Sequence, residues 1–442
     1  MEFRPALRRK LLLAVVYIGL FLDYALLTSV EPILPAFFLE QDSKSSGIPV
    51  ANTPNPALLA DENSRLGILV GMKCLVQVFT QPFIGPLTTR IGFSVPLFIG
   101  FIIMIVSTIL FAFGQSYGVL FAARAIQGIG SASVATAGMG MLAQQYSDDK
   151  ERAHYMGIAM GGMALGLLVG PPYGGVMYDL LEAKKFVSCF WPALQFLVPN
   201  VGDSTSMRRL LMDPRVLIAA GSIVVANLGL GVLIPGLMLW MVEKWNTSAT
   251  GLGFIFVPGC IAYLAGTTFL PTLTIKIGRW LCVLIVLPII AVCLALMSVA
   301  PSIYVVVIPI TIIGIGIGFV DSAMIPLLGQ LAYQKHKEEE ETLCETSPLI
   351  PGDLLDLDSP SETSLETGNY AANAYAISDA GLSIAYFVAP ISSGPLVHAI
   401  GFPWMTWSFA IFICLFAPLA LVLRKPITRE RTRHDSALPN RR

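Results

Sequence analysis

The chain has 442 residues, of which 55% are hydrophobic and only 13% are charged, and its formal net charge is −1. A soluble domain carries about a quarter charged residues, so this composition indicates an integral membrane protein. The nearly neutral charge argues against nucleic-acid binding, and the seven cysteines have no metal-ligand spacing and are expected to be buried apolar residues.

Apolar segments long enough to cross a bilayer, about twenty residues each, recur along the whole chain. They lie near 11–36, 65–88, 93–114, 117–146, 153–178, 215–241, 250–275, 279–299, 302–331, 371–399 and 402–423. Basic residues cluster before the first segment and in alternate loops, which predicts that both termini face the cytoplasm. This orientation needs an even number of crossings, so the short segment 186–199 has to cross or re-enter as a shortened or incomplete sixth helix.

Glycines four residues apart in the fifth segment predict a helix face without side chains, on which a neighbouring backbone can pack closely in lipid. The stripe consists of Gly162, Gly166, Gly170 and Gly174. On this stripe alone, an ordinary tight helix crossing is as good an explanation as a specialised one. The wider spacing resembles the antiporter motif of major facilitator exchangers, whose members here are Gly157, Gly166, Gly170, Pro171, Gly174 and Gly175.

Two halves of the chain resemble each other. GPLTTRIG at 85–92 corresponds to PTLTIKIG at 271–278, each a short basic turn that ends in glycine. An internal repeat of this kind predicts an all-α major facilitator fold, with two pseudo-symmetric six-helix bundles that face a midplane cavity. We expect a first bundle at 1–182, a sixth segment and central cytosolic loop at 183–214, a second bundle at 215–334 and 370–425, an acidic loop at 335–369 and a cytosolic tail at 426–442.

The acidic loop is rich in proline and serine and contains no aromatic residue, so we expect it to be disordered. One part resembles an acidic dileucine signal, made by Glu345, Leu349 and Ile350. A second part resembles a clathrin box, made by Leu354, Leu355, Asp356, Leu357 and Asp358. Together they predict clathrin adaptors and clathrin as partners, and chance apolar pairs in a linker are the alternative.

Several ionisable residues lie inside the apolar segments, where such groups cost several kcal/mol unless they are paired or hydrated. They are Asp23, Glu31, Lys73, Arg124, Asp321 and Asp379. A proton-coupled carrier needs a buried carboxylate that titrates between the pH values of two compartments, and a cationic substrate needs an anionic site. The alternative is a set of hydrogen-bonded acids and packing charges with a structural role only.

Motifs in nearly every segment resemble those of the vesicular amine transporters, which exchange vesicular protons for monoamines or acetylcholine. The motifs are FLDYALLTSVEPILP, GILVGMKCLVQVFTQPFIGPLTTRIG, ARAIQGIGS, GRWLC, GFVDSAMIP, YAISDA and GFPW. GRWLC and Tyr263 favour the monoamine branch, whereas the stretch from Leu396 to Gly401 is closer to the acetylcholine branch.

The resemblance implies roles for individual residues. Asp23 would contact the substrate ammonium, Lys73 and Asp379 would form a buried ion pair, and Asp321 would be the main proton-binding acid. The remaining implied members are a gating or structural cation and two pocket-lining tyrosines, namely Arg124, Tyr263 and Tyr386. Rings can bind a cation through their faces, although a core position is the alternative for both tyrosines.

The chain also departs from the family pattern. Tyr24 stands where the family has asparagine, and Ile234 stands where it has glutamate. If the halves are aligned by their prolines, Glu31 is the pseudo-symmetric partner of Ile234, so we hypothesise that the acid has moved across the cavity; a position near the luminal water is the alternative. No cysteines are available for the family's luminal disulfide, and Asn246 begins a glycosylation sequon.

The sequence therefore predicts a multi-pass membrane protein of synaptic or secretory vesicles that loads cationic amines, monoamines first, in exchange for protons by alternating access. It is not expected to be an enzyme or to need a metal or cofactor; its partners are a small amine, protons and the lipid bilayer. The alternatives are a carrier of acetylcholine or a polyamine, and a transport-dead membrane scaffold that recruits clathrin adaptors.

Overall fold

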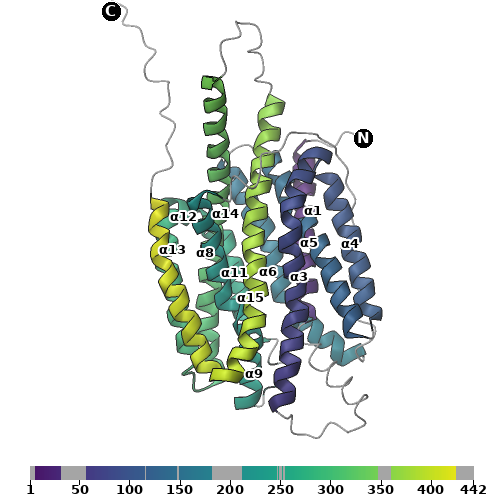
Figure 1. Ribbon diagram of the computed structural model, residues 1–442, viewed down its shortest axis with the longest axis vertical. Helices are drawn as coiled ribbons and strands as arrows, with labels where there is room; N and C mark the ends of the chain where they lie inside the picture. The colour runs from purple at the N-terminus through teal and green to yellow at the C-terminus, as the bar shows by residue number, and fades with distance from the viewer. Residues whose placement is uncertain are drawn as a thin grey trace, which may run out of the picture.

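The computed structural model describes residues 5–30, 56–114, 116–146, 149–181, 212–245, 247, 251, 254–346 and 360–424. Within these ranges every regular element is a helix, as predicted. Nine helices of the described chain are long and apolar enough to cross a membrane. The helices stand side by side in one elongated bundle, and α1 begins at the same end of the bundle at which the last helix finishes (Figure 1).

The first half contributes five helices to the described residues. They are α1 (Pro5–Ser29), α3 (Pro56–Ile91), α4 (Ser94–Phe113), α5 (Tyr117–Gln145) and α6 (Asp149–Leu181). The strongest packing within this half joins α1 to α6, α4 to α5 and α3 to α5.

The second half is built in the same way. Its elements are α8 (Pro214–Gly231), α9 (Leu233–Trp245), α11 (Val257–Phe269), α12 (Pro271–Ile277), α13 (Arg279–Met297), α14 (Ile303–Thr346), α15 (Pro360–Phe416) and the 3-10 helix η2 (Ala417–Arg424). Here α8 packs on α15, α13 on α14 and α11 on α14, so the pairing repeats that of the first half.

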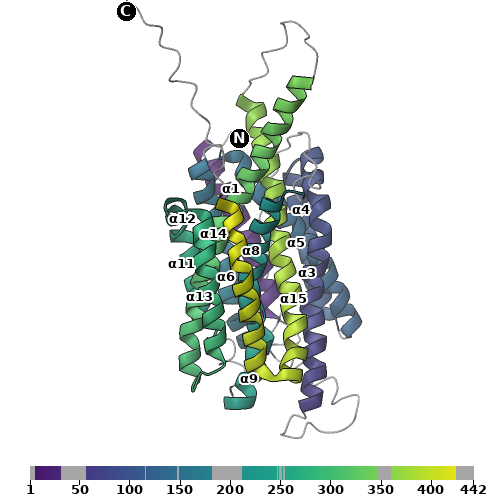
Figure 2. The same cartoon turned by 60° about the vertical axis from the view of Figure 1, so that its left-hand side comes forward.

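Two helices in this half are interrupted. The segment α15 contains two helices, because Gly401 has a φ of 81° and the chain reverses there; Figure 2 shows the two arms side by side. The break between α8 and α9 falls just before Pro235, which has no N–H to donate to the preceding turn.

The repeated basic turns are alike in conformation. Gly92 follows α3 with a φ of 81°, and Gly278 follows α12 with a φ of 102°. Both angles lie in the left-handed region, which glycine adopts without steric cost. The internal repeat predicted from GPLTTRIG and PTLTIKIG is therefore present in the backbone.

The glycine stripe of α6 packs directly on the backbone of α1. A Cβ atom added to Gly162 would meet the carbonyl oxygen of Tyr17, and one added to Gly166 would lie 2.5 Å from the carbonyl oxygen of Phe21. Gly170 and Gly174 meet Thr28 and Ser29 in the same way, so the two helices run parallel in close contact. Gly157 instead faces the second half, where its Cβ would lie 3.3 Å from the carbonyl oxygen of Thr267.

In the described chain the two halves contact each other mainly through three helix pairs, α3 with α15, α5 with α15 and α6 with α11. Side chains on the outside of the described bundle are largely apolar: Phe83 is 74% exposed and Phe113 is 80% exposed. Cys414 is on this outer surface, unlike Cys74, Cys260, Cys282 and Cys293, which are buried as expected. An apolar exterior with polar groups inside is the arrangement that a bilayer requires.

The acidic loop differs from the prediction at both ends. Residues 335–346 continue α14, and 360–369 begin α15, so both are helical rather than disordered; the two helices extend beyond the rest of the bundle (Figure 1). Lysine and glutamate are strong helix formers, which explains how an acidic sequence extends a membrane helix. Glu345 lies in the last turn of α14, and the rest of both sorting motifs, like the predicted sixth segment at 186–199, lies outside the described residues.

Candidate functional site

The charged residues predicted inside the bundle are buried there. The exposed fraction is 1% for Asp23, Lys73, Arg124 and Asp321 and 2% for Asp379. A buried charge is stable only with partners that replace its hydration. In the described chain these partners form separate polar clusters.

The first cluster joins three helices of the first half. Lys73 Nζ on α3 lies 3.2 Å from Asp23 Oδ2 on α1 and forms an ion pair with it. Ser131 Oγ on α5 donates a hydrogen bond to the other carboxylate oxygen. The ring of Tyr24 lies 5.4 Å from Lys73 Nζ, within range of a cation–π interaction. Asp23 is thus fully neutralised and hydrogen-bonded.

This pairing differs from the one that the resemblance implied. Asp379 was expected to form the ion pair with Lys73, whereas the ion pair in the described chain is between Lys73 and Asp23. The sequence could not decide between the two acids, because either one can be reached by a long lysine side chain from the middle of α3.

The second cluster crosses between the two halves. Gln77 Nε2 on α3 donates a 2.8 Å hydrogen bond to Asp379 Oδ2 on α15, and Gln81 Nε2 donates to the same oxygen. No described group hydrogen-bonds to Asp379 Oδ1. Neither glutamine was predicted from the sequence, although both follow Lys73 at intervals of one helical turn and therefore lie on the same face of α3.

The third cluster lies within the second half. Asp321 on α14 accepts a 3.2 Å hydrogen bond from Asn227 Nδ2 on α8 and a 3.1 Å hydrogen bond from the Tyr263 hydroxyl on α11. Both side chains that donate hydrogen bonds to this carboxyl group in the described chain are neutral. Asn227 was also missed, and a lone amide in an otherwise apolar helix was its only signal.

Arg124 on α5 ties together three helices of the first half. Its Nη1 donates to Gln127 Oε1 at 2.8 Å, and its Nη2 donates to the carbonyl oxygen of Leu27 on α1 at 3.3 Å. Its guanidinium also lies 5.0 Å from the ring centre of Phe111 on α4. These contacts hold the ends of α1, α4 and α5 together.

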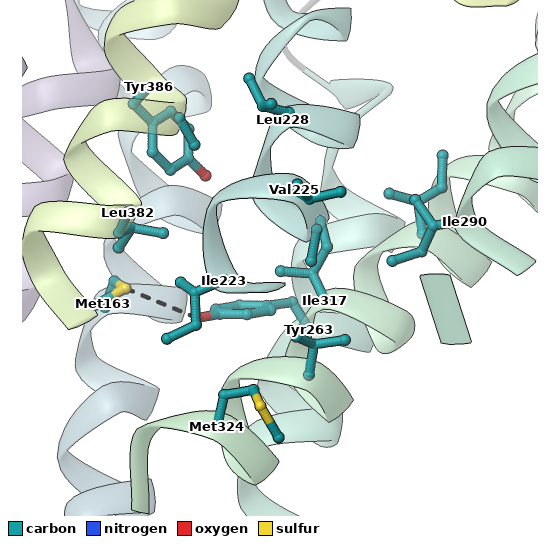
Figure 3. Packing of buried hydrophobic residues seen from close by; sticks show 14 of the residues in the cluster. Met163, Ile223, Val225, Leu228, Tyr263, Ile290, Ile317, Met324, Leu382 and Tyr386 are labelled. Carbon is teal, nitrogen blue, oxygen red and sulfur yellow. Dashed lines mark hydrogen bonds between the residues drawn. The ribbon is translucent and has the colours of Figure 1, made fainter. Parts of the chain in front are cut away.

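Tyr263 and Tyr386 line a small cavity between the halves (Figure 3). First-half residues Met163 and Leu167 line it from the opposite side, and its volume is about 10 Å³. That is close to the space needed by one water molecule, so an amine does not fit.

Glu31 and Asn246 lie outside the residues that the structure describes, so it tests neither the proposed displacement of the acid nor the glycosylation sequon. Ile234, the residue opposite Glu31 in the aligned halves, is partly buried against the apolar core at the start of α9.

Known proteins similar to this chain are membrane transporters. The family model described as Major Facilitator Superfamily matches residues 16–339. The synaptic vesicular amine transporter of Homo sapiens is 35% identical over 490 residues, covering 96% of this chain and 89% of that protein. The chromaffin granule amine transporter of Rattus norvegicus is 34% identical, covering 96% and 89%.

A more distant relative and a solved structure extend this comparison. The vesicular acetylcholine transporter of Torpedo torpedo is 29% identical over 97% of this chain and 85% of that protein. The crystal structure of the human organic anion transporter MFSD10 (TETRAN) superposes with a TM-score of 0.62 at 15% identity, covering 93% of this chain and 99% of that one. At that identity the likeness concerns the fold alone.

Proposed function

The chain belongs to the Major Facilitator Superfamily and, within it, to the vesicular amine transporters, and from this membership we propose that it loads cationic amines into acidic vesicles in exchange for protons. Membership of a transporter family indicates a transporter rather than an enzyme. The buried ion pair between Asp23 and Lys73 carries the proposal, because it supplies an anionic site that is neutralised while no substrate is present.

The substrate ammonium takes the place of Lys73 on Asp23. The substrate and Lys73 each carry an ammonium group, and the Asp23 carboxylate is the negative charge of the pair that can bind either one. The displaced ammonium has a second acceptor nearby, because Asp379 lies within electrostatic range of Lys73 and its Oδ1 accepts no hydrogen bond in the described chain. Substrate binding in the first half is thereby linked to an acid of the second half.

Asp321 is the acid that exchanges the proton. Asp23 has a lysine partner at 3.2 Å, whereas Asp321 is held by an amide and a phenol that carry no charge. Burial disfavours an ionised carboxylate unless a positive charge compensates it. Of these two acids, Asp321 therefore gains more from taking up a proton.

Transport proceeds by rocking of one half against the other, which changes the contacts of α15 with α3 and α5 and of α11 with α6. Glycine at 157 permits a close approach of α6 to α11, because an added Cβ atom would lie 3.3 Å from the carbonyl oxygen of Thr267.

The test is uptake by the full chain in proteoliposomes that are acidic inside. Labelled serotonin, dopamine, acetylcholine and spermidine are supplied outside, with and without the pH gradient. We expect monoamine uptake that disappears when the gradient is collapsed, and none for Asp23→Asn. Gradient-independent uptake, or no uptake of any amine by the natural sequence, contradicts the proposal.

Acetylcholine or another quaternary amine is the second candidate substrate. The face of Tyr24 already lies against a cation, the ammonium of Lys73, and aromatic faces bind quaternary ammonium groups without needing hydrogen bonds. The same uptake assay separates the two, since competition by excess acetylcholine against labelled serotonin favours this second substrate.

A further inference from the structure

The hydroxyl of Tyr263 lies between the two halves and has an acceptor in each. Within the second half it is 3.1 Å from Asp321 Oδ2. Across the interface it is 3.7 Å from Met163 Sδ on α6, the contact drawn as a dashed line in Figure 3. Tyr263 is 5% exposed and Met163 is 2% exposed, so water does not compete freely for the hydroxyl.

A phenol has one hydrogen and therefore donates to one acceptor at a time. An ionised carboxylate has only acceptor sites, and a hydrogen bond to a charged acceptor is about twice as strong as a neutral one. A thioether is a weak acceptor. While Asp321 is ionised, the hydrogen of Tyr263 is thus held within the second half.

A proton on Asp321 reverses this arrangement. The carboxyl group then has a hydrogen of its own, which it donates from Oδ2 to the Tyr263 oxygen. Asn227 keeps its hydrogen bond, because it donates to the other oxygen, Oδ1. The phenol hydrogen turns to Met163 Sδ, so one proton added at Asp321 produces one new hydrogen bond between the halves.

We propose that Tyr263 is a positioning residue that transmits the protonation of Asp321 to α6 through Met163. The bond is available only when α11 packs on α6 as it does here and Asp321 carries a proton. It therefore favours passage of the protonated carrier through this arrangement of the halves over passage of the empty, ionised carrier. This consequence rests on the proposed exchange of protons for amines, whereas the hydrogen-bond switch itself does not.

Few residues around Tyr263, apart from Asp321, could make its hydrogen bond to Met163 depend on pH. Tyr375 and Tyr386 on α15 interact electrostatically with Tyr263, and phenols carry no charge near neutral pH. The groups that α8 and α6 contribute, Asn227 and Met163, do not titrate. The charged residues farther along the chamber are Asp23, Lys73 and Asp379, and the first two neutralise each other.

The first experiment measures thermal unfolding of the full chain in detergent at mildly acidic and mildly alkaline pH. Met163→Leu keeps the volume and removes the acceptor, and Met160→Leu is the matched control, because Met160 is buried in the same helix. We expect Met163→Leu to lower Tm by about 1–2 °C more at acidic than at alkaline pH. Equal shifts of the two variants at both pH values overturn the proposal.

A second background identifies the titrating group. In Asp321→Asn the side chain cannot ionise, so the effect of Met163→Leu on Tm should no longer depend on pH. Persistence of the pH dependence in that background assigns it to another residue and overturns the proposal. These measurements need no transport, so they decide the switch even if the natural sequence takes up no amine.

The third experiment is a double-mutant cycle on gradient-driven uptake. Met163→Leu and Tyr263→Phe should each lower the initial rate, by about threefold for the loss of one weak hydrogen bond. In the Tyr263→Phe background, Met163→Leu should have no further effect. Independent, multiplicative losses contradict a shared hydrogen bond.

Discussion

At the scale of single residues, each buried acid inside the bundle has a partner on a neighbouring helix that offsets the free-energy cost of its burial. Asp23 and Lys73 compensate each other at 3.2 Å, whereas Asp321 and Asp379 rely on neutral donors. The sequence predicted which charges would be central, because an ionisable residue in an apolar segment is conspicuous. The resemblance implied an ion pair between Lys73 and Asp379, whereas Lys73 pairs with Asp23, because the pairing depends on the register between α1, α3 and α15.

Removing the cation of the ion pair should be more harmful than removing both charges. Lys73→Met leaves Asp23 buried without a counter-charge, which costs about 3–5 kcal/mol of the free energy of unfolding. The double variant Asp23→Asn with Lys73→Met should recover most of that loss but no uptake. Unfolding of the purified chain in detergent measures both, and a stable Lys73→Met variant would contradict the buried pair.

Neutralising Asp321 should separate amine binding from proton coupling. Asp321→Asn keeps a side chain that can bond to Asn227 and Tyr263, so the fold and the site at Asp23 should persist. We expect gradient-driven uptake to fall to background while binding of a labelled amine without a gradient is retained. Asn227→Leu is a useful comparison, because it removes a hydrogen-bond donor to Asp321 without removing the acid. Gradient-driven uptake that survives in Asp321→Asn argues against Asp321 as the proton site.

At the scale of helices, the closest contacts are made by glycine. The spacing of glycines in α6 indicated a tight crossing, and the structure identifies the partner as α1. The partner could not be read from the sequence, since any neighbouring backbone can occupy a face without side chains. The extension of α14 was missed for another reason: composition suggested disorder, while the helix propensity of lysine and glutamate in residues 335–346 favours continuation.

The crossing of α1 and α6 should tolerate no side chain. A Cβ atom at Gly166 would lie 2.5 Å from the carbonyl oxygen of Phe21 and 2.8 Å from the backbone nitrogen of Ala25. Gly166→Ala should therefore lower the free energy of unfolding by about 1–3 kcal/mol or more. Gly118→Ala in α5 is the control, because nothing lies within 4 Å of an added Cβ there, and it should be neutral or slightly stabilising; similar losses in both variants argue against the crossing.

At the scale of the whole molecule, two repeated halves meet where α15 packs on α3 and α5 and where α11 packs on α6. The repeat could be predicted from two short basic turns that both end in glycine. The positive φ angles of Gly92 and Gly278 explain why glycine stands at these two positions. The packing between the halves could not be predicted, because it depends on side chains from both halves that meet at a cavity of about 10 Å³. The sequence therefore indicates the two bundles but not how their side chains meet.

Holding the halves together should stop transport. A Cβ atom at Gly71 on α3 would lie 3.1 Å from Ile391 Cδ1 on α15, so the two positions face each other between the halves, and the test is to oxidise cysteines introduced at both. The cross-linked carrier should lose amine uptake and regain it after reduction, while each single cysteine variant remains insensitive to the oxidant. Undiminished uptake by the cross-linked protein would mean that these helices do not separate.

The seam between α1 and α6 has a further consequence. Asp23 belongs to one of these helices and Met163 to the other, and backbone packed on backbone leaves almost no slack between them. A displacement of Met163 on α6 is therefore transmitted to α1 and so to Asp23. The proposed amine site and the residue proposed to respond to the proton on Asp321 move as one rigid unit.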